Sequence, residues 1–173
     1  MISITHISAG AAVGTLVGSF IPNPVIAVPV AFLAGVASHH LLDMVPHTDT
    51  GSFRKEGDKE TLKRQKKVMK TSELGVAVID NGIALAILGY LFLAKDMNWA
   101  LVAGAIGGVF PDYFHHIPIW GYQVREWWKG YYSFHETYHA TAKGWMIPVG
   151  ILTNLIITVI SVWYVIAVNA KVH

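Results

Sequence analysis

The first 42 residues of the chain contain no Asp, Glu, Lys or Arg. An uncharged stretch of this length exceeds the roughly 20 apolar residues that cross the hydrocarbon core of a bilayer. Over the whole chain 53% of residues are hydrophobic and 14% are charged, whereas ordinary soluble domains carry about 25% charged residues. The sequence therefore predicts an all-α, polytopic membrane protein that forms a single membrane domain.

Five apolar segments predict about five transmembrane helices. Their expected ranges are 7–21, 25–42, 74–94, 99–110 (extendable to 117) and 145–168. Pro22-Asn23-Pro24 predicts a tight turn between the first two helices. The chain then divides into a first helical hairpin (1–47), a basic cytoplasmic loop (48–72), a second helical hairpin (73–117), an interfacial aromatic segment (118–144) and a C-terminal transmembrane helix (145–168).

The two hairpins share a short internal repeat. Segments 34–47 and 103–116 both begin with Ala-Gly, carry an Asp eight residues after the Gly, and carry a His four residues later. Repeats are common in membrane folds. The repeat predicts two hairpins of one design, related by a pseudo-twofold axis, whose polar ends meet.

The basic residues predict the orientation. Eleven of the 13 Lys and Arg residues fall in segments 48–72 and 117–144, which the positive-inside rule places in the cytoplasm. We therefore expect a multi-pass protein of the inner cell membrane with a cytoplasmic N-terminus. Membrane lipid is the expected partner, and the basic loop would attract anionic headgroups. Since topology explains the basic stretch, no nucleic-acid partner is expected; the oligomeric state is left open.

Polar residues gather where the predicted helices reach the cytoplasmic face. The candidate metal ligands there are His6, His39, Asp43, His47, Glu73, Asp112, His115, His116, His135 and His139. Residues four apart share a helix face, as His39 and Asp43 do. Cysteine is absent, so imidazole and carboxylate ligands favour a divalent metal, zinc first and manganese or iron next. The number of donors predicts two or more ions.

Three further acidic residues are candidates for proton transfer: Asp49, Asp80 and Glu136. Asp80 lies within a predicted span, where a charge is costly. It could bind metal, orient a ligand, or be a protonated acid bonded to a neighbouring helix. Glu136 belongs to the segment His135-Glu136-Thr137-Tyr138-His139, which matches H-E-x-x-H. Because this motif is typical of zinc metallopeptidases, an intramembrane metallopeptidase is one alternative. The preceding run WWKGYYSF (127–134) is typical of an interfacial belt or a monotopic helix.

Taken together with His6, the motifs SHHLLDMVPHTD (38–49), GGVFPDYFHH (107–116) and FHETYH (134–139) resemble those of the prokaryotic membrane-bound metal-dependent hydrolases. That family is linked to the zinc-dependent phospholipase C fold class. The resemblance implies six metal ligands: His6, His39, Asp43, His47, Asp112 and one of His115 or His116. It also favours Glu73 and the pair His135 and His139.

The leading functional hypothesis is therefore a membrane-embedded, metal-dependent hydrolase. Its substrate would be a phosphoester-containing lipid or another membrane-associated phosphoester at the cytoplasmic interface. The alternative from another class is a non-enzymatic metal- or haem-binding membrane protein, such as a transporter, sensor or electron carrier. Asp43 and Asp112 speak against haem, because haem iron does not usually take carboxylate ligands.

Overall fold

The computed structural model describes residues 1–55, 57–94 and 98–168, and within these ranges the chain is all-helical. The helices are α1 (Ser3–Phe20), α2 (Pro24–Asp43), α3 (Asp58–Arg64), α4 (Thr71–Leu93), α5 (Trp99–His116), α6 (Gly121–Trp127), α7 (Lys129–Tyr138) and α8 (Ile147–Val168). Two short 3-10 turns, η1 (Thr50–Phe53) and η2 (Gly144–Met146), accompany them. The all-α prediction is confirmed, and α1, α2, α4, α5 and α8 correspond to the five apolar segments.

Three helical segments are long and apolar enough to cross a membrane: Pro24–Asp43, Thr71–Leu93 and Gly144–Val168. Their outward faces carry exposed Leu, Ile and Val side chains, as in helices that contact lipid. The other two long helices, α1 and α5, have 18 residues each. The three candidate spans support a membrane location, whereas the number five remains a prediction.

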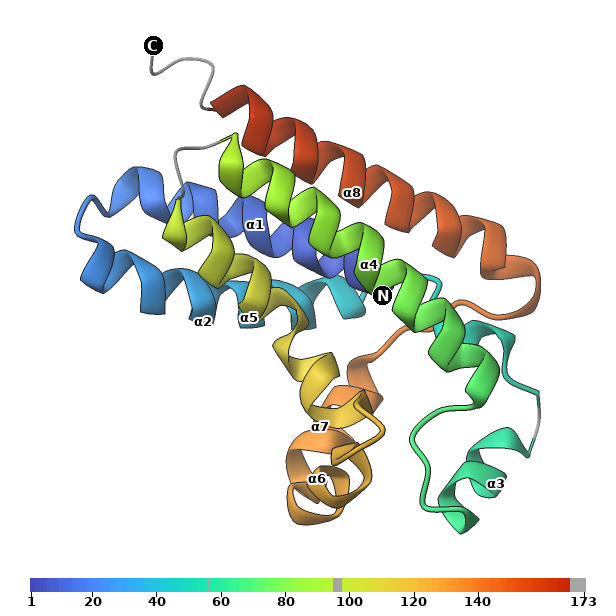
Figure 1. Ribbon diagram of the computed structural model, residues 1–173. Helices are drawn as coiled ribbons and strands as arrows, with labels where there is room; N and C mark the ends of the chain where they lie inside the picture. The colour runs from blue at the N-terminus through green and yellow to red at the C-terminus, as the bar shows by residue number, and fades with distance from the viewer. Residues whose placement is uncertain (56, 95–97, 169–173) are drawn as a thin grey trace.

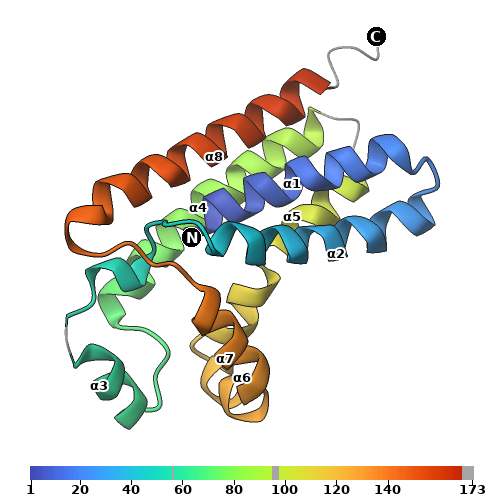
Figure 2. The ribbon, with the colours of Figure 1, turned by 180° about the vertical axis from the view of Figure 1, so that it is seen from behind.

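Helix α1 lies at the centre of the bundle, packed against α2, α4, α5 and α8 (Figures 1 and 2). The sequence allows this because α1 and α5 each carry a Gly-x-x-x-Gly pattern, Gly10/Gly14 and Gly104/Gly108. A Cβ built on Gly104 would lie only 2.3 Å from the carbonyl oxygen of Gly10. Small residues at this spacing let helix backbones approach closely in membranes.

The helix pair α2–α5 brings the internal repeat together. A Cβ on Gly35 would lie 2.2 Å from the carbonyl oxygen of Gly104, the equivalent glycine of the second copy. The two following carboxylates, Asp43 and Asp112, therefore reach the same end of the bundle. Figures 1 and 2 show α3, α6 and α7 on this side, where α1 begins and where α2 and α5 end.

Candidate metal centre

The carboxylate of Asp43, the last residue of α2, is the centre of a buried cluster of imidazoles. Its Oδ2 lies 3.1 Å from both His39 Nε2 and His135 Nε2. Its Oδ1 lies 3.2 Å from His6 Nε2 and accepts a hydrogen bond of 2.9 Å from the Met1 amino group. The Asp43 carboxylate, the three imidazoles and the Met1 amino group are all almost fully buried. A carboxylate contacted on both oxygens in this way can bridge two ions.

One group of candidate donors, His39, His40 and His135, contains no carboxylate. Two further groups share Asp43. The first consists of His39, Asp43, Asp112 and His135, whose ligand atoms all lie within 4.8 Å of one another. The second consists of Asp43, His47 and His139 under the same distance limit. Each of these two groups has the mixture of nitrogen and oxygen donors that zinc, manganese and iron accept. The described residues can therefore hold metal at this position, from helices α2, α5 and α7 and from the segments that follow α2 and α7.

Hydrogen bonds fix the orientation of two imidazoles in the cluster. His39 Nδ1 donates to the carbonyl oxygen of Gly108 at 2.8 Å, and His47 Nδ1 donates to that of Val45 at 2.8 Å. Their Nε2 atoms, directed at Asp43, are then left as lone-pair donors. Metal-binding histidines commonly have their other ring nitrogen held by a backbone carbonyl or carboxylate in this manner.

A third imidazole is fixed by a chain of side-chain hydrogen bonds. His139 Nδ1 donates to Thr141 Oγ1 at 2.9 Å, and the Thr141 hydroxyl donates to Asp49 Oδ2 at 2.9 Å. Burial lowers the pKa of His139 to about 4, so at pH 7 its imidazole is neutral, the form that binds metal. Burial opposes ionisation of Asp49, but the hydrogen bond with His47 and the charges of the Met1 amino group and the nearby imidazoles together outweigh it and hold the pKa of Asp49 below its usual range. Asp49 thus lies beside the second donor group and orients it.

The backbone also joins the two chain segments that carry this second group. The amide of His47 donates to the carbonyl oxygen of Ala140 at 3.2 Å, and the amide of Ala142 donates to that of His47 at 2.7 Å. These bonds form a single parallel bridge between His47 and Thr141. Thr141 was not singled out in the sequence, because a lone threonine two residues after a histidine carries no distinctive pattern.

The two adjacent histidines at the end of α5 have different surroundings. His116 Nδ1 lies 3.6 Å from Asp112 Oδ1, at the edge of the cluster. His115 is buried on the other side, where its ring packs against those of Tyr131 and Tyr132. Of this pair, the structure therefore brings His116 to the candidate centre and not His115.

Glu73 is not brought into the cluster. Both of its carboxylate oxygens accept hydrogen bonds of 2.8 Å from the Arg54 guanidinium, and Oε2 also accepts one from the Lys70 amide. This two-pronged ion pair attaches the basic segment to the start of α4. Both carboxylate oxygens are thus engaged by one guanidinium and one backbone amide, so Glu73 is a structural partner of Arg54.

Asp80 caps the first turn of α1. Its two carboxylate oxygens accept hydrogen bonds from the amides of Ser3 and Ile4, which have no partner within their own helix. The cap fixes the start of the helix that carries His6. Asp80 therefore supports the position of a donor without being one of the donors.

We predict that Asp80→Ala lowers stability but leaves the metal in place. Loss of a helix cap costs about 0.5–2 kcal/mol, and Asp80→Asn should recover part of this because its amide oxygen still accepts a hydrogen bond. Thermal unfolding and elemental analysis of the same samples measure the two effects. Complete loss of metal in both variants would instead show that Asp80 is a metal ligand.

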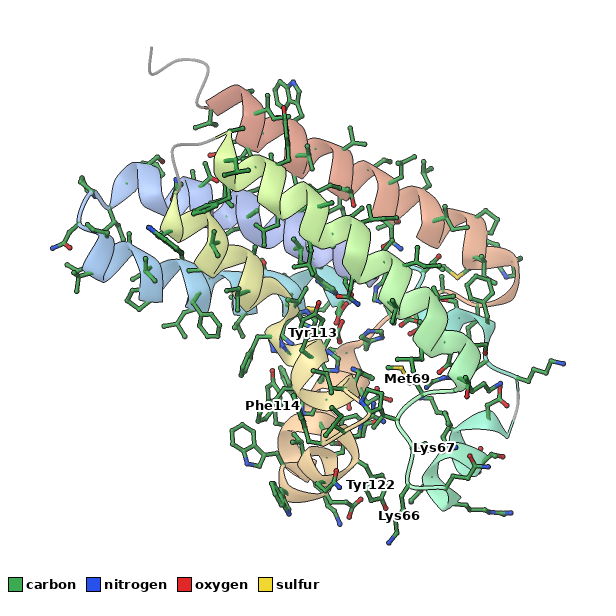
Figure 3. The ribbon with its side chains drawn as sticks, viewed as in Figure 1. Lys66, Lys67, Met69, Tyr113, Phe114 and Tyr122 are labelled. Carbon is green, nitrogen blue, oxygen red and sulfur yellow. The ribbon has the colours of Figure 1, made fainter. Side chains whose placement is uncertain are left out.

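A cavity of about 960 Å³ lies beside the cluster, between α4, α5 and the basic segment. Figure 3 shows Tyr113 and Met69 in this region, with Phe114 on the opposite side of α5; Tyr113 and Met69 both line the cavity. Its cluster side is formed by Asp49, Asp112, His116 and His139. The donors are therefore buried yet reachable by a molecule larger than water. Nothing in the sequence indicated this cavity.

Glu136 lines the same cavity but does not belong to either donor group. Its Oε2 accepts a hydrogen bond of 3.1 Å from Lys59 Nζ, on α3. Burial raises and the Lys59 charge lowers the pKa of this carboxyl, with a net lowering. Glu136 is thus an ionised group at the cavity surface. Its neighbours His135 and His139 face Asp43.

Comparisons of the chain with protein-family models, with curated proteins and with solved structures each found no match.

Proposed function

We propose that this protein is a metal-dependent hydrolase of a membrane-associated phosphoester, with its centre at the cytoplasmic surface of the inner membrane. The observation that carries the proposal is the shared, buried Asp43, contacted on both carboxylate oxygens by imidazoles. Three of the surrounding histidines have Nδ1 hydrogen-bonded and Nε2 directed at the Asp43 carboxylate. This is a donor set for ions, and the adjacent cavity gives a substrate access to them.

The arrangement favours two ions with Asp43 between them. His39, Asp112 and His135 would complete one set of ligands, and His47 and His139 the other. His6, whose Nε2 is buried and makes no hydrogen bond within the described part of the chain, is a further donor on the first side. Zinc is the first candidate, with manganese or iron next. Bound ions would supply Lewis acidity and an activated water.

The chain's own residues support an anionic substrate. Lys55 and Lys143 line the cavity together with the donors Asp112 and His139, so a phosphoester would meet positive charge as well as metal. Arg54 and Lys59 also line the cavity, but they are paired with Glu73 and Glu136. An apolar wall that includes Leu74 and Val78 continues onto the exposed face of α4, which suits a substrate held at a lipid surface.

Glu136 and His116 are the groups best placed to move protons in the cavity. They line it without belonging to the two donor groups, and a general acid or base must reach the reacting atoms without being held by metal. Asp49, by contrast, is held by Thr141 and faces His47 and His139. We assign it the role of orienting ligands.

We predict that Glu136→Gln keeps its metal and loses hydrolysis by about 100-fold or more, the range of a general acid or base. Steady-state hydrolysis of p-nitrophenyl phosphate and of a lipid phosphate in vesicles measures the loss. Glu60→Gln is the matched control, since Glu60 also lines the cavity. Unchanged hydrolysis in Glu136→Gln would remove Glu136 from the mechanism.

The same preparation tests the proposal against its alternatives. The metal-loaded protein should hydrolyse a phosphoester and not a peptide. Cleavage of a transmembrane peptide, lost in Glu136→Gln, would favour the intramembrane metallopeptidase. Metal binding with no hydrolysis of either class would favour a metal-binding protein without enzymatic activity, and a haem Soret band would favour an electron carrier.

A further inference from the structure

Helices α6 and α7, with the turn before them, carry an exposed aromatic surface that the proposed function does not use. We call residues 118–139 the α6–α7 arm. Its large exposed apolar side chains are Ile119, Trp120, Trp127, Trp128, Phe134 and Tyr138. Trp127 is 77% exposed and Ile119 78%. A contiguous surface of this kind normally has an occupant.

The arm is attached to the bundle mainly by polar contacts. None of its residues belongs to the two hydrophobic clusters found among the described residues. Its polar contacts with the bundle include those of His135 with Asp43, of Tyr131 with His40, and of the Arg125 guanidinium with the His115 carbonyl oxygen. Helix α7 thus presents its site histidines to Asp43, while Phe134 and Tyr138 beside them are half exposed.

The aromatic surface continues the outer face of a membrane-spanning helix. A chain of ring contacts runs from Phe32 on α2 to Phe110 (5.5 Å between centroids), then to Phe114 (5.4 Å) and to Trp128 (5.3 Å). Helix α2 is one of the three candidate spans. The outer face of a spanning helix contacts lipid, so the surface that continues it is placed to contact the same bilayer. Figure 3 shows Phe114 on the side of α5 away from the cavity.

A second recess connects the arm with α2. It has a volume of about 310 Å³ and is lined by His40, Asp43, Met44, Phe134, His135 and Tyr138. Met44, Phe134 and Tyr138 are at least half exposed at its mouth. An apolar mouth beside a spanning helix suits part of an acyl chain and offers little to a polar ligand.

We infer that the α6–α7 arm lies in the boundary between headgroups and acyl chains of a phospholipid bilayer. Tryptophan and tyrosine favour this boundary because one end of each ring system is apolar and the other forms hydrogen bonds. The arm then supplies His135 and His139 from the membrane surface. This fixes the depth of the metal centre at the headgroups, whether or not the centre hydrolyses anything.

Spin labels on single cysteines test the inference, since the chain has no cysteine of its own. Gly130→Cys keeps every aromatic residue, and a Cβ there meets no atom within 4 Å. Gly130 precedes Phe134 by four residues and shares its helix face. Lys63→Cys, on α3 and exposed, is the control in water. Both full-length proteins are placed in phosphatidylcholine–phosphatidylglycerol vesicles, and relaxation by oxygen and by a neutral nickel chelate is measured by power saturation.

We expect oxygen to relax the label at position 130 several-fold more than the nickel chelate, with the reverse order at position 63. The same nickel-dominated pattern at both positions would overturn the inference, because the arm would then lie in water. Shielding of position 130 from both agents, relieved when the protein is diluted in lipid, would also overturn it and assign the surface to a second copy of the chain.

Discussion

Asp43→Ala should remove both metal ions at once. Asp43 is the one residue common to the two donor groups that contain a carboxylate, so its loss leaves each of these sets of imidazoles without a bridge. Losing even an outer partner of a metal ligand weakens binding by about 10–100-fold, so we expect the apparent dissociation constant to rise by more than about 100-fold. Hydrolysis should fall with metal content. Elemental analysis after equilibration with buffered zinc measures the change.

The matched control is Asp58→Ala, which removes a carboxylate bound to Lys70 that belongs to none of the donor groups. It should retain wild-type metal content. Because Asp43 is buried, helicity and monodispersity of the Asp43→Ala protein must equal those of wild type for the comparison to hold. A folded Asp43→Ala protein that keeps both ions contradicts a shared, Asp43-bridged centre.

Gly104→Ala should disrupt the bundle. The added Cβ would lie 2.3 Å from the carbonyl oxygen of Gly10 and 2.7 Å from Cα of Gly14. Both neighbours are backbone atoms of α1, which cannot turn aside as a side chain would. We expect a loss of more than about 3 kcal/mol in the free energy of unfolding, above the usual 1–3 kcal/mol of overpacking.

Gly82→Ala is the control for this prediction, since a Cβ at Gly82 meets nothing within 4 Å. The same substitution there should be neutral or stabilise by up to about 1 kcal/mol, the difference in helix propensity. Unfolding in mixed micelles of increasing SDS fraction compares the two proteins. Equal stability of Gly104→Ala and Gly82→Ala would mean that α1 and α5 are not packed backbone to backbone.

The positions of the long helices could be predicted from the sequence because apolar length alone determines them in a membrane. The prediction 25–42 and the helix Pro24–Asp43 differ by a residue at each end. The gathering of His39, Asp43 and Asp112 was predictable for a related reason: polar groups at helix ends must collect where lipid ends. Which helix would occupy the centre was not predictable, because α1 and α2 have similar apolar character and only the glycine contacts distinguish them.

The roles of individual acidic residues depended on partners that the sequence does not reveal. Glu73 begins its helix as His6 begins α1, but Arg54, from a loop, takes both of its carboxylate oxygens. Asp80 lies within a candidate span, yet it accepts hydrogen bonds from two backbone amides of α1. Polar residues of segments 48–72 and 118–144 fold into short helices that apolar periodicity cannot predict, so the cavity between them could not be predicted either.

The most direct test of the central claim is anomalous diffraction from crystals of the zinc-loaded protein at the zinc edge. We predict two peaks about 3.5–4 Å apart, the spacing of carboxylate-bridged pairs. The Asp43 carboxylate should lie between them, with His39 and His135 on one side and His47 and His139 on the other. The absence of a peak at Asp43 in protein saturated with zinc would contradict the account.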